Sequence, residues 1–358
     1  RRALTLAARS RPSPNPQVGA LVVQDGQVVG EGFHEAPGRP HAEINALARA
    51  GENAAGATLY VTLEPCCHHG RTGPCTEAIS GAGIRRVVIG TLDPDSRVNG
   101  CGARALLNHM EVTCGVLESE CRDQLEGYIH HRTTGRMLVR LKAAMTLDGY
   151  IATSSGDAKW ISGESARKEV HRMRADHDAV LVGIRTVLAD DPLLTVRHCE
   201  GIQPSRIVLD SHLRIADTAR LVTSHREAPV LICHGPDADP RKKDRLHQLG
   251  IDTLELPQSA TGLDIHTLLS ELARRGMLSL LVEGGGAVHG SFIREGLADR
   301  LALFIAPKLI GGGFRWASLP DVSAIRDAWK LQQLRCRMFD EDILVEGHFQ
   351  STDQCPSL

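Results

Sequence analysis

The sequence predicts an α/β protein with two domains, and three observations support this prediction. The chain has 358 residues, which exceeds the usual size of one domain core. Apolar strand runs alternate with helical stretches in both halves of the chain, which is typical of α/β architectures. A polar stretch separates two strand-rich blocks. We therefore expect domains at 1–136 and 137–358, with a linker helix at about 117–136.

The first domain is expected to open with a β-hairpin. Asp25-Gly26 stands between two apolar runs in the segment from Val18 to Phe33, and such a pair is a strong signal for a two-residue hairpin turn. The pattern then predicts the following elements in order: a helix near 41–50, a strand at 58–63, a helix from about 75, a strand at 86–91, a helix near 102–109 and a strand at 111–116. These elements form an α/β sandwich.

The second domain is expected to hold a sheet that is covered on both faces. Its strand runs are RMLVRLKAAM, DAVLVG, RIVLD, PVLICH, SLLVEG, RLALFIAP and DILVEGHF. Several of them are apolar throughout, as strands buried on both sides are. Helices are expected near 163–175, 241–249, 262–275 and 287–296.

Composition and charge exclude some classes of partner. Forty-one basic and forty-three acidic residues give a net charge of -2, so the overall electrostatic footprint of a duplex-binding protein is absent. The apolar runs are shorter than the roughly 18 to 20 residues that cross a bilayer. The ten cysteines are scattered over a long chain, so we expect free thiols, with Cys101, Cys114, Cys233 and Cys336 buried. A cytoplasmic homo-oligomer that binds small molecules, and neither nucleic acid nor membrane, is expected.

Two segments of the first domain supply the ligands of a catalytic zinc site. Pro40-His41-Ala42-Glu43 carries an imidazole, and the run from Glu64 to Cys75 carries the thiols of Cys66 and Cys75. Three protein ligands leave one position for water, whose pKa a bound Zn²⁺ lowers towards neutrality. Glu43 would then move a proton to the departing nitrogen. Residues two apart point in different directions on a regular helix, so His41 must lie in an irregular first turn.

Other interpretations of these residues remain open. Cys67, His68 or His69 could provide a fourth ligand and make the zinc structural. Cys67 could also replace its neighbour Cys66, which is favoured by its place after Pro65. The zinc deaminase signature separates its two cysteines by two residues, whereas here eight lie between them.

The wider pattern resembles the bifunctional pyrimidine deaminases and reductases of riboflavin synthesis over nearly the full length of the chain. The matching residues are Pro14-Asn15-Pro16, Val18-Gly19, Gly32-Phe33-His34 and the run from Thr62 to Cys75. The resemblance implies a cytidine-deaminase-like α/β/α sandwich in which His41, Cys66 and Cys75 bind zinc and Glu43 is catalytic. It also implies that the deaminase substrate contacts Asn15, His34, Arg71 and Asp93. Arg71 suits a phosphate on chemical grounds as well, because a guanidinium offers paired donors.

One stretch departs from that family. Asp93-Pro94-Asp95-Ser96 stands where the family usually has Asp-Pro-Asn-Pro. An added carboxylate repels a phosphorylated substrate unless it points away or pairs with a cation. Asp95 is therefore not expected to bind the substrate.

A second site is expected in the second domain. No Gly-x-Gly-x-x-Gly motif follows a strand there, so the usual dinucleotide fingerprint is absent. Leu281-Val282-Glu283-Gly284-Gly285-Gly286 instead ends a strand and enters a helix, where backbone amides could receive a phosphate. A glycine triplet at such a place can also be a simple turn.

The second domain is similar to the reductase half of the same family, whose fold is like that of dihydrofolate reductase. Five landmarks carry the similarity: LKAAMTLDG at 141–149, KWIS at 159–162, TVLADDPLLTVR at 186–197, VEGG at 282–285 and APKLIG at 306–311. The resemblance implies that NADPH contacts Ala144, Trp160, Thr186, Asp190, Ser211, Gly285 and Gly286. It implies that the substrate contacts Ala158, Arg174, Leu194, Arg197 and Glu283.

Chemistry suggests roles within this second set. Arg174 and Arg197 could hold one phosphate, or they could lie on a solvated helix face and in a salt bridge. Lys142 and Glu283 could polarise the ribose carbon and handle its proton, or they could form a structural ion pair. No basic cluster in the sequence decides between NADPH and NADH.

Together the two sites predict one enzyme with two activities. The first domain would hydrolytically deaminate 2,5-diamino-6-(5-phosphoribosylamino)pyrimidin-4(3H)-one, and the second would use NADPH to reduce the ribosyl side chain to ribityl. A zinc-dependent nucleic-acid base deaminase with a C-terminal binding domain is the alternative, although the chain has few aromatic residues for stacking on bases. A non-catalytic zinc protein is a second alternative.

Overall fold

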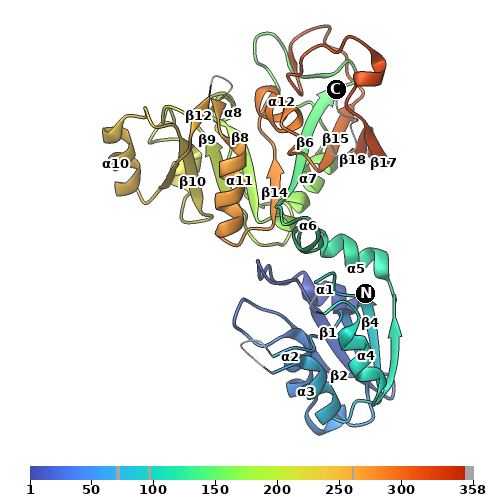
Figure 1. Ribbon diagram of the computed structural model, residues 1–358. Helices are drawn as coiled ribbons and strands as arrows, with labels where there is room; N and C mark the ends of the chain where they lie inside the picture. The colour runs from blue at the N-terminus through green and yellow to red at the C-terminus, as the bar shows by residue number, and fades with distance from the viewer. Residues whose placement is uncertain (70–72, 96–97, 260–261, 351–358) are drawn as a thin grey trace. The chain divides into compact units, whose positions relative to one another are not determined.

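The computed structural model describes residues 1–69, 73–95, 98–259 and 262–350. It divides into two compact units, Arg1–Arg136 and Met137–Leu358 (Figure 1). Within the described ranges, no helix is long and apolar enough to span a membrane.

The first unit is built on a five-stranded sheet with the order β2-β1-β3-β4-β5. β1 is antiparallel to β2 and to β3, and β3, β4 and β5 are parallel. The strands are β1 (Gly19–Gln24), β2 (Gln27–Phe33), β3 (Thr58–Leu63), β4 (Arg86–Thr91) and β5 (Glu111–Cys114). The helices are α1 (Arg2–Ala7), α2 (Ala42–Ala50), η1 (Gly51–Ala54), α3 (Cys75–Gly81), α4 (Cys101–Leu107), α5 (Glu118–Gln124) and α6 (Glu126–Thr134).

Helices cover both faces of this sheet, as its register shows. A Cβ on Gly32 would meet α2, and Gly32 pairs with Ala20 on the same face. A Cβ on the next residue of β1, Gly19, would meet the backbone of α1 on the opposite face. Gly90 of β4 would meet Cys121 of α5 on that same opposite face. The first unit is therefore an α/β/α sandwich, with α1 and α5 on one side and α2 on the other.

Gly32 is needed for the close approach of β2 and α2. A Cβ at this position would lie 2.1 Å from the carbonyl oxygen of Ala42 and 2.5 Å from the amide nitrogen of Ala46. Both are backbone atoms, so no rotamer change can relieve the clash. The packing sets the place of the first turn of α2, which carries Glu43 and follows His41.

Gly32→Ala is expected to destabilise the first unit by about 1–3 kcal/mol, the usual cost of overpacking a core. Gly81→Ala is the matched control, because a Cβ there meets nothing within 4 Å. Thermal unfolding followed by circular dichroism measures both variants. Equal unfolding temperatures for Gly32→Ala and the wild type would contradict this account of the packing.

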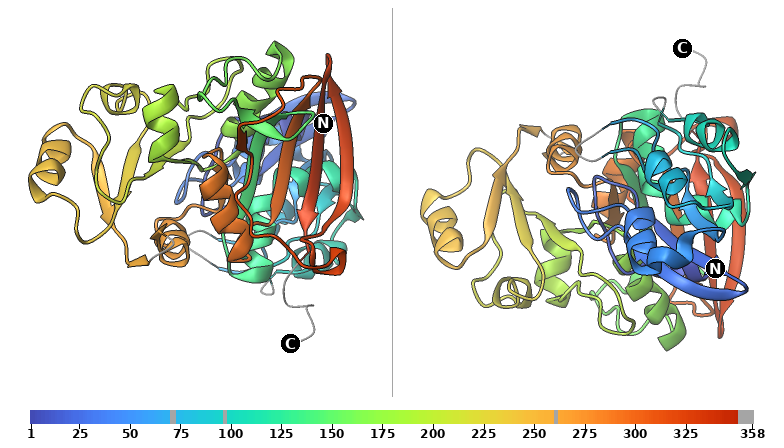
Figure 2. Two further views of the ribbon diagram at one scale, coloured as in Figure 1. Left: turned by 90° about the horizontal axis from the view of Figure 1, so that it is seen from above. Right: turned by 90° about the horizontal axis from the view of Figure 1, so that it is seen from below.

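The second unit is built on a nine-stranded sheet with the order β11-β10-β9-β8-β14-β6-β15-β18-β17. Neighbouring strands are parallel from β11 to β15 (Figure 2). β18 is antiparallel to β15, and β17 is antiparallel to β18. The strands of this sheet are β6 (Leu138–Thr146), β8 (Ala179–Gly183), β9 (Ser205–Leu209), β10 (Val230–His234), β11 (Asp252–Glu255), β14 (Ser279–Val282), β15 (Arg300–Ala306), β17 (Leu331–Phe339) and β18 (Asp342–Phe349). Two small sheets pair β7 (Tyr150–Ala152) with β16 (Phe314–Arg315) and β12 (Gln258–Ser259) with β13 (Gly262–Leu263).

Helices flank both faces of the large sheet. They are α7 (Glu164–Asp176), α8 (Ile184–Asp190), α9 (Arg220–Thr223), α10 (Pro240–Gln248), α11 (Ile265–Arg274), α12 (Gly286–Arg294) and η2 (Ile325–Asp327). Leu268 of α11 and Phe292 of α12 share a buried cluster with Leu181 of β8. The next strand residue, Val182, belongs to a different cluster with Leu246 of α10. The apolar strand runs therefore reflect burial on both sides.

Three sequence expectations need correction. The single linker helix expected at 117–136 is two helices, α5 and α6, which meet at Leu125. β11 and β17 of the large sheet are not among the expected elements, and neither are α8, α9 and the short strands β7, β12, β13 and β16. Cys233 is buried, but Cys101 in α4 is half-buried, and Cys114 and Cys336 are exposed. The last two lie on the edge strands β5 and β17, whose side chains are poorly covered on the faces of the sheets.

Two candidate active sites

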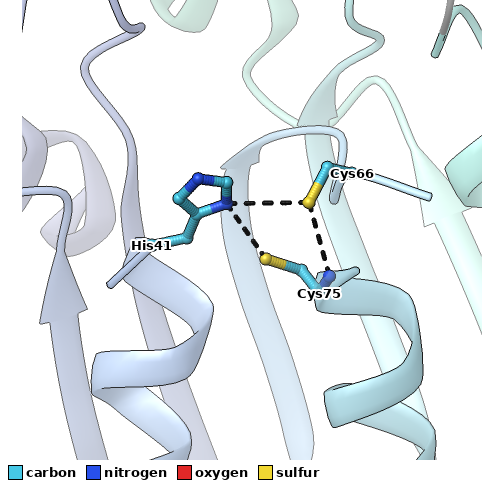
Figure 3. A group of neighbouring side chains, drawn as sticks. All are labelled: His41, Cys66 and Cys75. Atoms are coloured by element: carbon cyan, nitrogen blue, oxygen red, sulfur yellow. Dashed lines mark hydrogen bonds between the residues drawn. The ribbon is translucent and has the colours of Figure 1, made fainter. Parts of the chain in front are cut away.

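Three side chains from separate elements meet in the first unit (Figure 3). His41 precedes α2, Cys66 lies in the loop after β3, and Cys75 begins α3. His41 Nδ1 lies 3.2 Å from Cys75 Sγ and 3.6 Å from Cys66 Sγ, and all three ligand atoms lie within 4.8 Å of one another. Zn–N bonds of about 2.0 Å and Zn–S bonds of about 2.3 Å give such separations around one tetrahedral ion. The donor set therefore fits zinc.

Local backbone geometry explains why His41 and Glu43 point to one place. His41 is the N-cap of α2, with extended backbone angles (φ -69°, ψ 163°). The helix starts at Ala42, so Glu43 lies in its first turn while the imidazole leaves from outside the helix. Pro74 likewise precedes α3, and the amide of Cys75 donates a hydrogen bond to Cys66 Sγ at 3.3 Å. The backbone amide at the start of α3 thus helps to hold the sulfur of Cys66 as an anion.

Protonation in this cluster suits metal binding and proton transfer. A hydrogen bond from Cys75 lowers the pKa of Cys66, and the bond with His41 acts in the same direction, while the same bond to Cys66 raises the pKa of Cys75. Cys66 is thereby held as a thiolate, the form that binds metals. Burial raises the pKa of Glu43, which is 3% exposed. A raised pKa moves a carboxyl group towards the range in which it can act as a general acid–base group.

A cavity adjoins this cluster. The residues that line it are Asn15, Pro16, Val18, His34, His41, Glu43, Leu63, Glu64, Cys66, His68, Asp93, Asp95, Val98, Tyr128 and Arg132. His34 Nδ1 lies 3.1 Å from the carbonyl oxygen of Pro40, and burial lowers the pKa of His34. The neutral ring therefore donates from Nδ1, and its Nε2 accepts from Asn15 Nδ2 at 2.9 Å. This pair presents a fixed polar edge to the cavity.

The far wall of the cavity is a loop held by a buried carboxylate. Glu64 accepts hydrogen bonds from the amides of Asp93, Gly100 and Ala103 at 2.9 to 3.1 Å. Glu64 thus joins the end of β3 to the loop after β4 and to the start of α4. Tyr128 of α6 donates to Asp93 at 3.1 Å.

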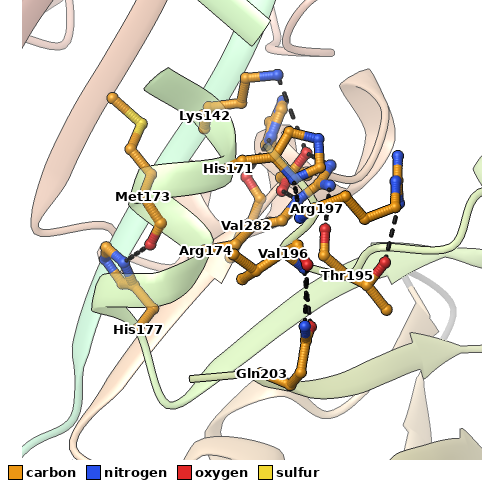
Figure 4. A network of polar contacts seen from close by, with 12 residues as sticks. Lys142, His171, Met173, Arg174, His177, Thr195, Val196, Arg197, Gln203 and Val282 are labelled. Carbon is orange, nitrogen blue, oxygen red and sulfur yellow. Dashed lines mark hydrogen bonds and ion pairs between the residues drawn. The ribbon is translucent and has the colours of Figure 1, made fainter. Parts of the chain in front are cut away.

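The second unit contains a buried charge cluster (Figure 4). Glu283 follows β14 and accepts two hydrogen bonds from Arg174 of α7, at 2.6 and 2.9 Å. Lys142 Nζ of β6 lies 3.9 Å from the same carboxylate. Burial would raise the pKa of Glu283, but Arg174 and Lys142 outweigh it and lower that pKa to about 2. Burial lowers the pKa of Lys142. Glu283 is therefore a permanent anion, and Lys142 is the group whose proton is held less tightly than usual.

The loop after α8 brings a further cation beside this cluster. Arg174 also donates to the carbonyl oxygen of Thr195 at 3.2 Å, and Arg197 donates to the Thr195 hydroxyl at 2.9 Å. The amide of Arg197 donates to His171 Nδ1 at 3.1 Å. Arg197 is exposed, whereas the Arg174 side chain is 11% exposed and bound to Glu283.

The segments that follow the neighbouring strands β8 and β14 are hydrogen-bonded to each other. The amide of Gly285 donates to Thr186 Oγ1 at 3.2 Å, which joins the start of α12 to α8. α12 has no acidic residue in its first turn and no side-chain cap. The dipole of such a helix start suits a phosphate group. Trp160 is 66% exposed and offers a ring for stacking, with Arg167 lying 4.6 Å from its centre.

Comparison with known proteins decides the family. A model of the cytidine and deoxycytidylate deaminase zinc-binding region matches residues 1–91, and a model of the RibD C-terminal domain matches residues 137–345. The riboflavin biosynthesis protein RibD of Aquifex aeolicus is 42% identical over 347 residues, which cover 96% of this chain and 95% of that protein. The chain belongs to the RibD family.

Other RibD proteins are similar to this chain over nearly its full length. The Escherichia coli K12 protein is 39% identical over 93% of this chain and 94% of its own length. A solved structure from Thermotoga maritima, described as a diaminohydroxyphosphoribosylaminopyrimidine deaminase/5-amino-6-(5-phosphoribosylamino)uracil reductase, is 39% identical and gives a TM-score of 0.81 over 98% of this chain and 97% of that one. A structure of Acinetobacter baumannii RibD gives 37% identity and a TM-score of 0.81 over the same shares.

RibD membership confirms the predicted fold class and the predicted dual activity. The chain combines a cytidine-deaminase-like region with a RibD reductase domain of dihydrofolate-reductase-like fold. It is a bifunctional deaminase and reductase of riboflavin biosynthesis. Zinc serves the deaminase, and NADPH serves the reductase. The predicted alternative, a nucleic-acid base deaminase with a C-terminal binding domain, is wrong, because that domain is a reductase.

The structure brings most of the residues predicted from the RibD resemblance to these two places. Asn15, His34, His41, Glu43, Cys66 and Asp93 share one cavity, and Cys75 adjoins it. One cluster contains Lys142, Arg174, Arg197 and Glu283. Leu194 directly precedes Thr195, which accepts hydrogen bonds from two of these residues. Ala158 lies between β7 and α7. Ala144 lies in β6, Ser211 follows β9, and Gly285 and Gly286 follow β14. Thr186 and Asp190 lie in α8, and Trp160 precedes α7. Arg71 lies outside the described residues.

Sequence reasoning assigned no role to three polar residues of the deaminase cavity, Glu64, Tyr128 and Arg132. Glu64 directly precedes Pro65-Cys66 at a strand end, so its position could have indicated a role. Tyr128 and Arg132 come from the linker, far along the chain from the zinc ligands, and no motif points to them. The described ligand cluster has three members, without Cys67, His68 or His69, which favours a catalytic rather than a closed structural zinc.

Proposed function

We propose that the first unit deaminates a phosphoribosylated diaminopyrimidinone and that the second reduces the ribosyl side chain of the deaminated product. The observation that carries the first half is the meeting of His41, Cys66 and Cys75 beside the buried Glu43. The Thermotoga maritima relative is named for these two reactions. The substrate would be 2,5-diamino-6-(5-phosphoribosylamino)pyrimidin-4(3H)-one.

The deaminase residues have three proposed roles: metal binding, proton transfer and substrate binding. His41, Cys66 and Cys75 would hold Zn²⁺, which when bound lowers the pKa of a water molecule towards neutrality. Glu43 takes up a proton and passes it to the amino group that leaves as ammonia, as its raised pKa allows. Asn15 and the neutral His34 orient the pyrimidine, and Asp93 fixes the opposite wall. Arg71 is proposed to bind the phosphate.

Some of the reductase residues act through their charge, and others contact the ligands by packing. NADPH supplies the reducing equivalent when it is bound near Ala144, Trp160, Thr186, Asp190, Ser211, Gly285 and Gly286. Lys142 holds the proton that the reduced side chain needs, and the permanent charge of Glu283 keeps that ammonium in place. Arg197 is exposed and would bind the substrate phosphate, while Arg174 supports Glu283. Ala158 and Leu194 would contact the substrate by packing.

The order of ammonia release and NADPH oxidation tests this proposal. The diamino substrate alone should release one equivalent of ammonia, and later addition of NADPH should consume one equivalent as the ribityl product appears. A titration of the deaminated product with NADPH and with NADH decides the cofactor preference. Absence of both ammonia release and NADPH oxidation would overturn the proposal.

The pH dependence of the reductase should report the group that holds the proton. The protonated form of Lys142 is the active one, so kcat should fall as pH rises through the Lys142 pKa, which burial places below the usual value of about 10.4. Glu283 is ionised above about pH 2, so it adds no acidic limb near neutrality. The measurement is kcat from about pH 6 to 10 with the deaminated substrate. An activity that rises with pH over the alkaline range would contradict this assignment.

We also propose that the enzyme is cytoplasmic and forms a homo-oligomer. The nine described cysteines are free thiols, which is typical of a reducing compartment such as the cytoplasm. β17 is an edge strand with exposed Leu334 and Met338, and an exposed edge of this kind favours association with a second copy. Small phosphorylated pyrimidines, and not nucleic acids, would be the other partners. Sedimentation analysis of Leu334→Lys against wild type tests the homo-oligomer.

A further inference from the structure

The backbone around Arg197 is held in place by side chains from other parts of the second unit. Gln203 Oε1 accepts the amide of Val196 at 2.8 Å, and Gln203 Nε2 donates to the carbonyl oxygen of Val196 at 2.9 Å. The amide of Arg197 itself donates to Nδ1 of the buried His171 at 3.1 Å (Figure 4). Consecutive residues of this segment are therefore fixed through their backbone, and the Arg197 side chain starts from a defined point.

One face of α7 connects this segment to the buried carboxylate of the reductase site. His171 and Arg174 are three residues apart on α7, so they lie on the same face of the helix. Arg174 binds Glu283 and also donates to the carbonyl oxygen of Thr195 at 3.2 Å. His171 holds Arg197, two residues further along. A single helix thus sets the relative positions of the Glu283 anion and the Arg197 cation.

His171 holds the Arg197 backbone without adding a charge. Burial lowers the pKa of His171 to about 4, and the cations Arg174 and Arg197 act in the same direction. The ring is therefore neutral at physiological pH, with one donor nitrogen and one acceptor nitrogen. Because Nδ1 faces an amide, Nδ1 is the acceptor and Nε2 carries the hydrogen. A carboxylate in this place would attract the guanidinium and compete with a phosphate, whereas a neutral imidazole does not.

We propose that His171 is a positioning residue of the reductase: its Nδ1 fixes the backbone of Arg197 so that the guanidinium meets the phosphate of the substrate. This inference rests on the proposed role of Arg197 as the phosphate-binding group. Its central consequence is that His171 acts through the Arg197 guanidinium. Loss of His171 should therefore matter only while that guanidinium is present, and only for a substrate that carries a phosphate.

The test compares His171→Phe and His171→Asn with the wild type and repeats His171→Phe in an Arg197→Met background. Phenylalanine keeps a ring but has no acceptor, so the reductase KM for the deaminated substrate should rise about fivefold, with kcat within about twofold of wild type. Asparagine can place its Oδ1 where the imidazole has Nδ1, so it should keep KM within about twofold of wild type. In the Arg197→Met background KM is already raised, and His171→Phe should raise it by less than about twofold further.

Further readouts separate positioning from a general loss of structure. The KM for NADPH should stay at the wild-type value in every variant, which also shows that the second unit is folded. The dephosphorylated form of the deaminated substrate should give equal KM values with wild type and His171→Phe, because it has no group for the guanidinium to bind. His266→Phe replaces an exposed histidine of α11 and is the matched control. His171→Met removes the acceptor with a flexible side chain, so it should show the same rise in KM if the phenylalanine variant does not fold.

Each result bears on His171 directly. An unchanged KM in His171→Phe would overturn the inference, and so would an equal rise in the Arg197→Met background or with the dephosphorylated substrate. A wild-type KM in Arg197→Met alone would also overturn it, because no guanidinium would then need positioning. A wild-type protein that oxidises no NADPH would instead contradict the proposed function. The dissociation constant of the deaminated substrate, measured by calorimetry without NADPH, should change by the same factors and would still decide the role of His171.

Discussion

Glu43→Gln should lower the rate of ammonia release by about a hundredfold to ten-thousandfold, the range that a positioned acid–base group contributes. Glutamine fills the same buried space next to His41 and Cys75, but it can neither take up nor release the proton. The zinc content should stay at the wild-type value, because the three ligand atoms come from other residues. Ammonia release and zinc content are measured on the same sample.

His41→Ala serves as the contrasting variant. It removes a ligand and should lose both zinc and ammonia release, whereas Glu43→Gln loses the activity alone. Reductase turnover in both variants should remain at the wild-type rate. Ammonia release by Glu43→Gln within about tenfold of wild type would remove Glu43 from the proton-transfer role.

Lys142→Met should lower the reductase kcat by about a hundredfold or more, because the proton donor is removed from a buried site. Methionine has a similar length and is apolar, so the space stays filled. Arg174 still holds Glu283 through two hydrogen bonds, so the carboxylate keeps a partner and the unit should stay folded. NADPH oxidation with the deaminated substrate measures the loss.

Lys168→Met is the matched control for this variant. It removes the same charge from α7, where Lys168 forms an exposed pair with Glu164, and it should leave kcat unchanged. A reductase kcat within about threefold of wild type in Lys142→Met would mean that Lys142 and Glu283 form only a structural ion pair.

Local patterns were sufficient to predict most of the fold. Asp25-Gly26 predicts the turn between β1 and β2, and both lie where expected. The apolar runs of β8, β9 and β14 predict a sheet covered on both faces, as the alternating clusters show. β17 was missed although Leu334, Cys336 and Met338 alternate with Arg335 and Arg337, and most of its residues are exposed. Its strand conformation depends on pairing with β18, which local sequence does not report.

The residues of the candidate sites were also predictable only where local sequence carries them. His41, Glu43, Cys66 and Cys75 could be predicted because short motifs carry them. Tyr128 and Arg132 could not, because their place in the deaminase cavity depends on how α6 packs. The ion pairs of Glu283 were anticipated only as one possibility, since a pairing between distant residues such as Arg174 and Glu283 is settled by the tertiary structure.

The two variants Glu43→Gln and Lys142→Met, each assayed for both reactions, test the central claim that one chain carries two separate active sites. The account predicts that Glu43→Gln loses ammonia release and keeps NADPH oxidation with the deaminated substrate, and that Lys142→Met shows the reverse. Loss of both reactions in either variant, with zinc content and folding intact, would contradict it.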